Sequence, residues 1–137
     1  MATIVLGYDH SDGAKHALRV AIELARQYSD RLVIGYGYGA TRGSGAEFRA
    51  HTAALEELAR EATDEGLALA QEAGLDAEVA LVAERPAATL IQLSEEHDAR
   101  FIVVGSYGES PLKSAILGST PHRLLHLSER PVVVVPA

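Results

Sequence analysis

Three glycines and two hydroxyl residues near the end of the chain have the spacing of a phosphate-binding site. Gly105 and Gly108 follow a short apolar run, and Gly118, Ser119 and Thr120 come after nine intervening residues, where a helix can begin. Glycine lets the backbone come within hydrogen-bond distance of a ligand, and the free N–H groups of a helix N-terminus attract an anion. The spacing favours a phosphate site, although an ordinary strand exit followed by a helix cap would give the same pattern.

A second group of reactive residues follows the first apolar run of the chain. Asp9, His10, Ser11 and His16 include the residue types of a nucleophile, a base and an acid. However, Ser11 is already suited to capping the helix that follows, and His16 falls one turn inside that helix. We therefore expect no hydrolytic triad here, and Asp9, at the end of a strand, fits either a turn that leads into the helix or a contact with a ligand.

Two further patterns resemble binding motifs but do not fit their context. Gly35-x-Gly37-x-x-Ala40 has the form of a dinucleotide fingerprint, yet no helical pattern begins at Ala40. His122 and His126, four residues apart on a helix, could hold a metal ion, but such pairs are more often exposed surface residues. We expect neither a dinucleotide site nor a metal site from these residues alone.

The composition is that of one soluble globular domain. The chain has 137 residues, of which 47% are hydrophobic and 23% charged, so we expect a single domain over residues 1–137. It contains no cysteine. This excludes a disulfide framework, a zinc–thiolate site, an iron–sulfur cluster and a thiol nucleophile.

The charge balance and the apolar runs limit the partners. Twelve Lys and Arg residues against nineteen Asp and Glu residues give a formal charge of −7 without any basic run, so we expect no nucleic acid partner. The longest apolar stretches, such as residues 132–135, are far shorter than the roughly 20 residues of a membrane span. The N-terminus also lacks the pattern of a signal peptide, so we expect a cytoplasmic protein that is not bound to a membrane.

The apolar pattern predicts an alternation of strands and helices. Strands are expected at residues 3–8, 31–38, 77–83, 101–104 and 132–135, and helices at 13–29, 48–73, 86–94 and 122–127. Ser11 or Asp12 is expected to cap the first helix, Gly74 to end the second, and Pro86 to begin the third. The inward residues expected on the second helix are Leu55, Leu58, Ala59, Ala62, Leu69, Ala70 and Ala73.

This alternation predicts a three-layer α/β/α sandwich around a parallel sheet. Parallel neighbours need long crossovers, and right-handed helical crossovers cover both faces of such a sheet. Ligands of open α/β sheets bind outside the carboxyl ends of the strands, where the strand order reverses. The loops that follow Tyr8, Tyr38, Ala83 and Val104 are therefore the expected places for a site.

The chain resembles the universal stress protein family over almost its whole length. The spacing from Gly105 to Ser119 matches that family's nucleotide-binding signature, G-x2-G-x9-G-[S/T]. Residues 4–11 resemble its first strand with the Asp-x-Ser ending, residues 82–91 the segment before its third helix, and residues 130–135 its last strand. The resemblance implies a five-stranded parallel sheet with the order 3-2-1-4-5.

The resemblance also implies an adenine-nucleotide site, with ATP as the ligand, alone or as its magnesium complex. In nucleotide-binding members the end of the second strand lies beside adenine, and the glycine motif holds the ribose and the phosphates. The residues of this chain that match are Asp9, Gly37, Val104, Gly105, Gly108, Gly118, Ser119 and Thr120.

Several residues depart from the family's pattern. Gly37 stands where the family usually has an aliphatic residue, so that wall of the base pocket is either open or filled by a tyrosine. Glu84 stands where glycine is common, and its carboxylate would repel phosphates unless it points outward. Tyr107 replaces a frequent basic residue, which leaves Lys113 and Arg123 as the nearby cations that could balance phosphate charge.

The sequence thus predicts a nucleotide-binding sensor or regulatory module of the stress response. No residue looks like a general base directed at water, so we expect no enzyme beyond very slow ATP hydrolysis. The alternative is an interaction module of the same fold that binds no nucleotide. In either case we expect a homodimer through the strand at residues 132–135, because a bare β-branched edge would promote aggregation.

Overall fold

The computed structural model describes residues 1–9, 11–39, 44–106 and 117–137. Gly108, Tyr107 and Lys113 lie outside these residues, as does His10. The described elements are, in chain order, β1 (Thr3–Gly7), α1 (Asp12–Tyr28), β2 (Arg31–Gly37), α2 (Ala46–Glu72), β3 (Ala77–Val82), α3 (Pro86–Glu96), β4 (Phe101–Gly105), α4 (Ser119–Leu127) and β5 (Val132–Val135).

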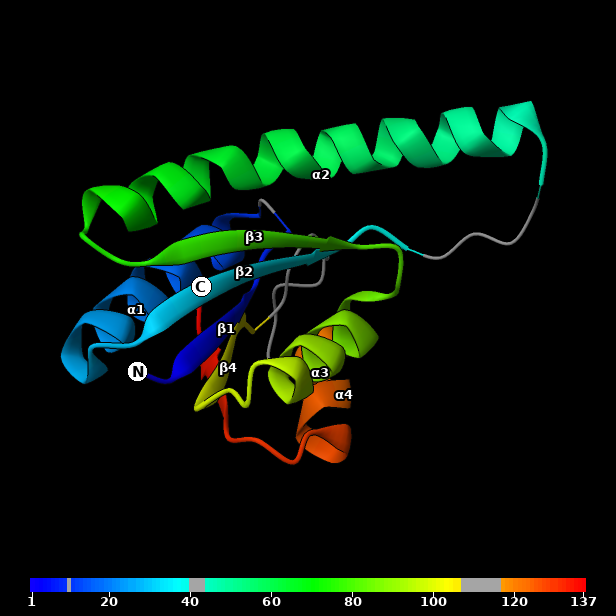
Figure 1. Ribbon diagram of the computed structural model, residues 1–137. Coiled ribbons are helices and arrows are strands. Elements are labelled where there is room, and N and C mark those ends of the chain that lie inside the picture. The colour runs from blue at the N-terminus through cyan, green and yellow to red at the C-terminus, as the bar shows by residue number, and fades with distance from the viewer. Residues whose placement is uncertain (10, 40–43, 107–116) are drawn as a thin grey trace.

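The five strands form one parallel sheet with the order β3-β2-β1-β4-β5 (Figure 1). This confirms the predicted three-layer α/β/α fold and its strand order. The order reverses between β2 and β4, on either side of β1, so the carboxyl ends of these three strands border one crevice. The fold therefore positions the end of β1 next to the start of the glycine motif.

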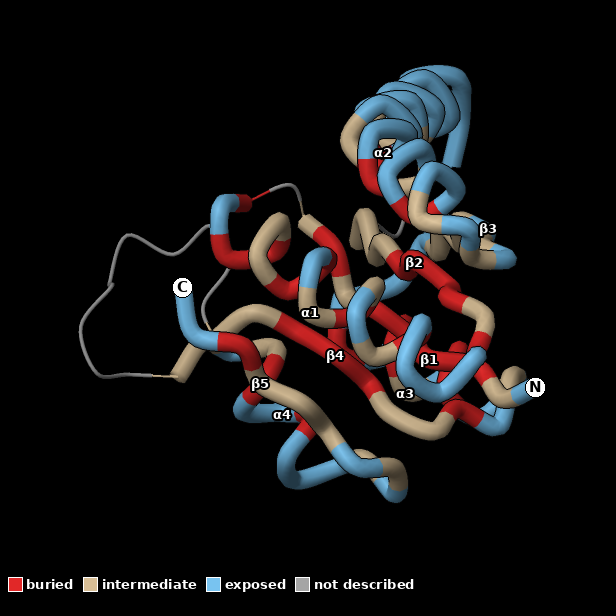
Figure 2. Tube along the Cα trace, turned by 90° about the vertical axis from the view of Figure 1, so that its left-hand side faces the viewer, coloured by how far each residue is buried: buried red, intermediate tan, exposed pale blue. Residues whose placement is uncertain are grey.

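Alternate residues of the strands pack on opposite faces of the sheet. Ile4 and Leu6 of β1 belong to a core shared with α1 and with the end of α2, whereas Val5 belongs to a core shared with α3 and α4. All three side chains are fully buried. Figure 2 shows this burial concentrated in the central strands, while most of α2 is exposed. A continuous apolar strand is what a sheet covered on both faces requires.

The buried face of α2 agrees only in part with the predicted one. Ala59 and Ala70 are buried as predicted, but Leu58 and Leu69, also expected to point inward, are 61% and 42% exposed. The helix buries Thr63 and Gly66 in their place, so its buried residues are all small and lie at helical spacing. Gly66 lies over Leu18 and Ile34, so the helix axis comes close to the underlying side chains and has no room for leucine there. The N-terminal half of α2 also extends beyond the end of β3 (Figure 1).

The helix ends follow the predicted capping residues. Ser11 caps α1, and its Oγ accepts a hydrogen bond of 3.1 Å from the Ala14 N–H. Gly74 follows α2 with a positive φ of 84°, and Pro86 occupies the first turn of α3. α4 begins at Ser119, three residues before the predicted start, because Gly118 takes the N-cap conformation. This earlier start brings the end of the glycine motif onto the helix N-terminus.

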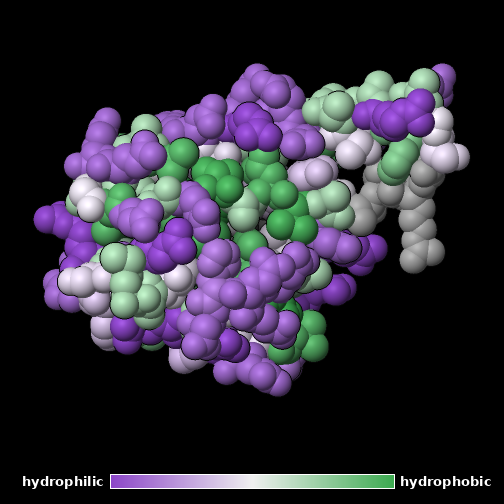
Figure 3. All heavy atoms as spheres, in the orientation of Figure 1, coloured by the Kyte–Doolittle hydropathy of each residue, from purple (hydrophilic) through white to green (hydrophobic). Residues whose placement is uncertain are grey.

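Both edge strands of the sheet are partly exposed. β3 is half-buried along most of its length, and Figure 3 shows hydrophobic side chains gathered over it below α2. β5 is likewise half-buried at its first three valines, while Val135 is buried. Within the described residues, no helix is long and apolar enough to cross a membrane.

Candidate functional site

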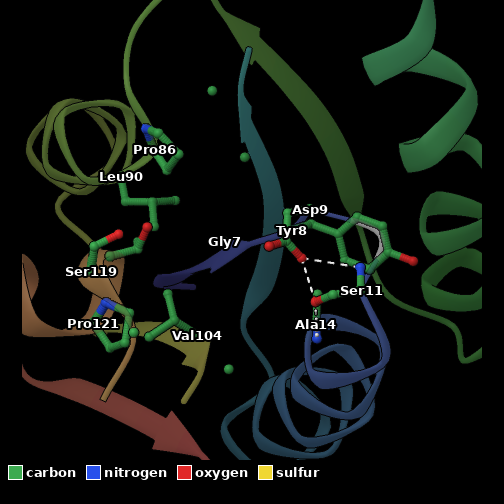
Figure 4. Close-up of a pocket in the computed structure, with 15 residues that line it drawn as sticks. Gly7, Tyr8, Asp9, Ser11, Ala14, Pro86, Leu90, Val104, Ser119 and Pro121 are labelled. Carbon is green, nitrogen blue, oxygen red and sulfur yellow. Dashed lines mark hydrogen bonds between the residues drawn. The ribbon is translucent and has the colours of Figure 1, made fainter. Parts of the chain in front are cut away.

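A cavity of about 170 Å³ lies at the carboxyl ends of β1, β2 and β4, where the strand order reverses. Residues from both halves of the chain line it, as Figure 4 shows. They are Gly7, Tyr8, Asp9, Ser11, Ala14, Gly35, Gly37, Pro86, Leu90, Val104, Gly105, Gly118, Ser119, Thr120 and Pro121. Seven of the eight site residues predicted from the sequence are in this set. The eighth, Gly108, lies outside the described residues.

Glycines on β1 and β2 allow α3 to pack close to the sheet beside the cavity. A Cβ atom on Gly7 would lie 2.6 Å from Leu90 Cδ1, and one on Gly35 would lie 2.7 Å from Leu93 Cδ1. Side chains at either glycine would therefore force Leu90 or Leu93 of α3 out of its present position. Leu90 can sit directly over the strand ends, and together with Pro86 and Val104 it gives the cavity an apolar wall (Figure 4).

The start of α3 occupies the space beside Gly37, the position where the resemblance leads one to expect an aliphatic side chain. A Cβ on Gly37 would lie 2.5 Å from Thr89 Oγ1 and 2.7 Å from the Glu84 backbone oxygen. The start of α3 therefore fills this wall, which is neither open nor filled by a tyrosine. Glu84 contributes its backbone to the wall, while its side chain is exposed and does not line the cavity.

Asp9 is held in place by the turn between β1 and α1. Its Oδ1 accepts hydrogen bonds from the Ser11 N–H at 3.1 Å and from Ser11 Oγ at 2.5 Å. Ser11 Oγ in turn accepts from the Ala14 N–H, so one chain of hydrogen bonds joins the cavity to the start of α1 (Figure 4). No other described residue hydrogen-bonds to Asp9, and the carboxylate can still accept a donor from a ligand in the cavity.

Tyr8 closes the cavity beside Asp9. It is 4% exposed, and its ring points away from Pro86 and Leu90 (Figure 4). Burial raises the pKa of the Tyr8 phenol, and the nearby carboxylates of Glu65 and Asp9 raise that pKa further. The phenol is therefore neutral at physiological pH, and the site gains no charge from it.

The two ends of the glycine motif meet at the end of β4. Ser106 donates its N–H to the Val135 carbonyl at 2.9 Å, and the Gly118 N–H donates to the Ser106 carbonyl at 2.7 Å. The second bond joins Gly118 to the end of β4. Gly105 and Gly118, thirteen residues apart in the sequence, thus line the same cavity.

The first turn of α4 presents hydrogen-bond donors to the cavity. Gly118 is the N-cap, no side chain caps the helix, and Pro121 has no N–H to offer. The backbone N–H groups of Ser119 and Thr120 have no backbone acceptor among the described residues. With the two hydroxyl groups and the positive end of the helix dipole, they can bind an anionic group of a ligand.

Positive charge does not come from the described lining of the cavity. None of the described residues that line it is Lys or Arg, and its one formal charge is the Asp9 carboxylate. Arg123 is exposed on α4 and does not line the cavity. Lys113, the other predicted cation, lies outside the described residues. Among the described lining residues, the groups that can attract an anion are the neutral donors at α4.

The residues considered for a hydrolytic triad are engaged in other contacts. Ser11 Oγ contacts Asp9 and Ala14, as described above, and His16 Nδ1 lies 2.8 Å from the Pro136 carbonyl. His16 is therefore directed at the end of the chain. The described residues of this group hold the fold around the cavity rather than activating a nucleophile.

The wall that α3 provides was not predicted from the sequence. Pro86 and Leu90 were assigned only to a helix, and Pro121 was not considered. The spacing of Gly35 and Gly37 could have indicated this wall, because residues two apart on a strand share one face and two glycines there leave room for a helix.

Comparison with known proteins matches the entire described fold to one family. A family model described as the universal stress protein family matches residues 1–136. A universal stress protein of Bacillus subtilis strain 168 is 30% identical over 150 residues, which cover 96% of this chain and 97% of that protein.

Solved structures share the fold over almost the whole chain. Universal stress protein UspA from Lactobacillus plantarum has a TM-score of 0.84 at 18% identity, covering 98% of this chain and 97% of that one. The Archaeoglobus fulgidus universal stress protein in complex with dAMP has a TM-score of 0.72 at 20% identity, with 98% and 97% covered. A universal stress protein in complex with cAMP has a TM-score of 0.69 at 28% identity, with 98% and 96% covered.

Proposed function

Since the chain belongs to the universal stress protein family, we propose that it binds an adenine nucleotide, ATP being the expected ligand, as a cytoplasmic sensor or regulatory module. The observation that carries this proposal is the hydrogen bond from the Gly118 N–H to the Ser106 carbonyl. It brings the N-terminus of α4 to the cavity that also contains Asp9. The Asp9 carboxylate, which accepts hydrogen bonds, and the anion-binding donors at the start of α4 can then contact the same ligand.

The chemistry of the cavity fits the parts of a nucleotide. Pro86 and Leu90 offer an apolar surface to a base, beside the end of β2. Asp9 can accept hydrogen bonds from ribose hydroxyl groups or from an exocyclic amine. The N–H and hydroxyl groups at Ser119 and Thr120 can bind phosphate oxygens.

Related structures support the choice of an adenine nucleotide. One structural neighbour is a complex with dAMP and another is a complex with cAMP. ATP itself is our proposal for this chain. If magnesium accompanies it, the phosphates would bring the ion, since Asp9 is the one carboxylate among the described lining residues.

We propose binding rather than catalysis as the role of this site. Among its described lining residues, Ser119 and Thr120 are hydroxyl groups near the expected phosphates, and none is His or Lys. Asp9 is the one described lining residue that could act as a general base, and its Oδ1 already accepts two hydrogen bonds from Ser11. At most we expect very slow hydrolysis of ATP.

The experiment that tests the proposal begins with nucleotide released from freshly purified protein. Mass spectrometry of the released material identifies an adenine nucleotide if the proposal is right. Addition of millimolar ATP with magnesium should then raise the melting temperature of the emptied protein, because a ligand that binds only the folded state stabilises it. No released nucleotide together with no thermal shift would reject nucleotide binding.

The alternative function is an interaction module that binds no nucleotide. The observation that favours this alternative is exposed apolar surface near β5. Leu125 and Leu127 of α4 are 55% and 61% exposed, and the first three valines of β5 are half-buried at the sheet edge. We propose that β5 forms a homodimer in both cases. Nucleotide binding then distinguishes the two functions, and the dimer does not.

A further inference from the structure

His122 and His126 form a pair of imidazoles on the outer surface of α4. Their ring centroids are 4.7 Å apart, and the rings meet edge to face at 66°. Both residues are exposed, whereas Pro121 and Leu124 form the buried face of the same helix. Residues four apart lie on one helix face, one turn above the other, so both rings can turn toward a common point in solvent.

This arrangement is suited to a metal ion of intermediate softness. Neutral imidazole nitrogen is a good ligand for zinc, copper and nickel, and two histidines at this spacing on a helix can bind the same ion. The helix holds their backbones in register before any ion arrives. Both rings are already within contact distance, so binding requires only side-chain rotation.

The spacing alone did not predict a metal site, but because the two rings are in contact we propose that His122 and His126 bind one divalent transition-metal ion, such as Zn²⁺, Ni²⁺ or Cu²⁺. No group of three or more His, Cys, Asp or Glu residues suited to a metal exists within the described residues. Within the proposal the two imidazoles are the protein ligands, and water completes the coordination shell. Such an open site binds more weakly than a closed structural zinc site with four protein ligands, and copper should bind more tightly than nickel or zinc.

The proposed metal site is separate from the proposed nucleotide site. Neither histidine lines the cavity, although Pro121, the residue before His122, does. The pair therefore acts whether or not a nucleotide binds. Its test uses the chain without nucleotide, so failure of one proposal leaves the other intact.

The test is calorimetric titration of the untagged, nucleotide-free chain with ZnCl2. We expect one Zn²⁺ per chain, and we expect His126→Gln and His122→Gln each to weaken binding at least tenfold. His97→Gln is the matched control and should leave the affinity unchanged. His97 is the strongest rival because its Nε2 lies 3.8 Å from a Glu78 carboxylate oxygen. An affinity that falls in the His97 variant but not in the other two overturns the proposal, as does the absence of binding at millimolar zinc.

A variant with changed spacing tests whether zinc binding depends on the position of the two histidines or only on their number. His126→Gln combined with Arg123→His keeps six histidines in the chain but places two of them on adjacent residues, about 100° apart around the helix. Arg123 is exposed, so the fold should persist, which circular dichroism can verify. This variant also loses a positive charge, so charge alone would favour cation binding. It should nevertheless bind zinc at least tenfold more weakly than the natural chain, and equal affinity would overturn the proposal.

Discussion

Asp9 has a structural contact and a free face at the same carboxylate. Through Oδ1 it holds the Ser11 turn that begins α1, at 3.1 Å and 2.5 Å. It also lines the cavity, where it carries the one formal charge of the described lining. Substitutions can separate these roles because asparagine keeps an acceptor oxygen and alanine does not.

Asp9→Ala should weaken ATP binding about tenfold or more, the cost of one charge-assisted hydrogen bond. It should also lower the melting temperature, because the Ser11 N–H and hydroxyl lose their acceptor. Asp9→Asn should keep the melting temperature and lose less affinity. Calorimetry and thermal melts on both variants test this, and an alanine variant with the affinity of the natural chain would remove Asp9 from the site.

At the opposite end of the sheet, Asp30 and Arg100 join the starts of three strands. Arg100 Nε donates to Asp30 Oδ2 at 2.6 Å, and the Ala2 N–H donates to Asp30 Oδ1 at 3.2 Å. The Asp30 side chain is only 1% exposed. Arg100 also stacks over the Tyr28 ring at 4.4 Å. The hydrogen bond from Arg100 holds the pKa of Asp30 below its ordinary value, despite the opposing effect of burial.

This lowered pKa predicts how stability depends on pH. A carboxyl group with a depressed folded-state pKa stabilises the fold above its unfolded value of about 3.9, and this contribution is lost as the pH falls through the folded-state pKa. Arg100→Gln should therefore melt several degrees lower than the natural chain at pH 7. The difference should narrow below about pH 4, with a remainder from the lost Tyr28 contact. Thermal melts from pH 7 to pH 3 measure both, and a difference that is constant with pH would contradict the assignment.

At the scale of the elements, phosphate binding by the N-terminus of α4 can be tested without disturbing the fold. Gly118 has φ of −60° and ψ of 163°, a conformation that any residue adopts. Gly118→Val should therefore fold with a nearly unchanged melting temperature. Its side chain would stand between the helix amides and a phosphate, so the thermal shift caused by ATP should disappear.

Gly118→Ser provides the matched control for this prediction. Serine is smaller than valine and is a favourable N-cap, so α4 should be at least as stable. The serine variant should retain more ATP affinity than the valine variant. If a folded valine variant bound ATP as tightly as the natural chain, the anion would have to bind elsewhere.

The packing of α3 on β2 leads to a different expectation for Gly37. Gly37→Val places carbon 2.5 Å from Thr89 Oγ1 and 2.7 Å from the Glu84 backbone oxygen, so α3 must move. Such overpacking costs about 1–3 kcal/mol, and ATP affinity should fall as the wall shifts. Gly66→Ala is the control, because its Cβ would meet Leu18 at an ordinary 3.5 Å. Chemical denaturation measures both, and a Gly37 variant as stable as the Gly66 variant would refute this packing argument.

The sequence predicted the elements best where a local signal determines them. Ser11, Gly74 and Pro86 marked helix ends correctly because capping depends on a few neighbouring atoms. The inward face of α2 was predicted wrongly at Leu58 and Leu69. Ala59 and Ala70 of the predicted stripe are buried, but Thr63 and Gly66 are buried in place of the two leucines. Which stripe is buried depends on the partner surface, which a single helix does not encode.

At the scale of the whole molecule, the strand order and the cavity followed from connectivity and from the family resemblance. Seven of the eight predicted site residues line one cavity because parallel strands end at one side of the sheet. The wall formed by Pro86 and Leu90 was missed since it arises from long-range packing of α3 on glycines of two other strands. Contacts of that kind leave only a faint trace in the sequence, here the paired glycines of β2.

The sheet has two edge strands, β3 and β5. The hydrogen bonds to their neighbours show which of their backbone groups point away from the sheet. The carbonyls of Pro131 and Val135 accept from the N–H groups of Ile102 in β4 and of Ser106, the residue after β4. Alternate residues of a parallel strand face opposite neighbours, so Val132 and Val134 direct their N–H and C=O groups away from β4. On β3, the carbonyls of residues 76 and 82 accept from β2, so Val79 faces the other open edge.

This geometry gives the proposed homodimer a specific test. Val134→Pro removes an outward N–H while leaving every bond to β4 possible, and proline is tolerated at sheet edges. If two chains pair through β5 about a two-fold axis, this variant should be monomeric at micromolar concentration, whereas the natural chain is dimeric. Val79→Pro makes the same change at the β3 edge and should stay dimeric. Light scattering on the natural chain and the two variants distinguishes the edges. A dimeric Val134→Pro variant together with a monomeric Val79→Pro variant would place the interface at β3. A monomeric natural chain would show that neither edge pairs in solution.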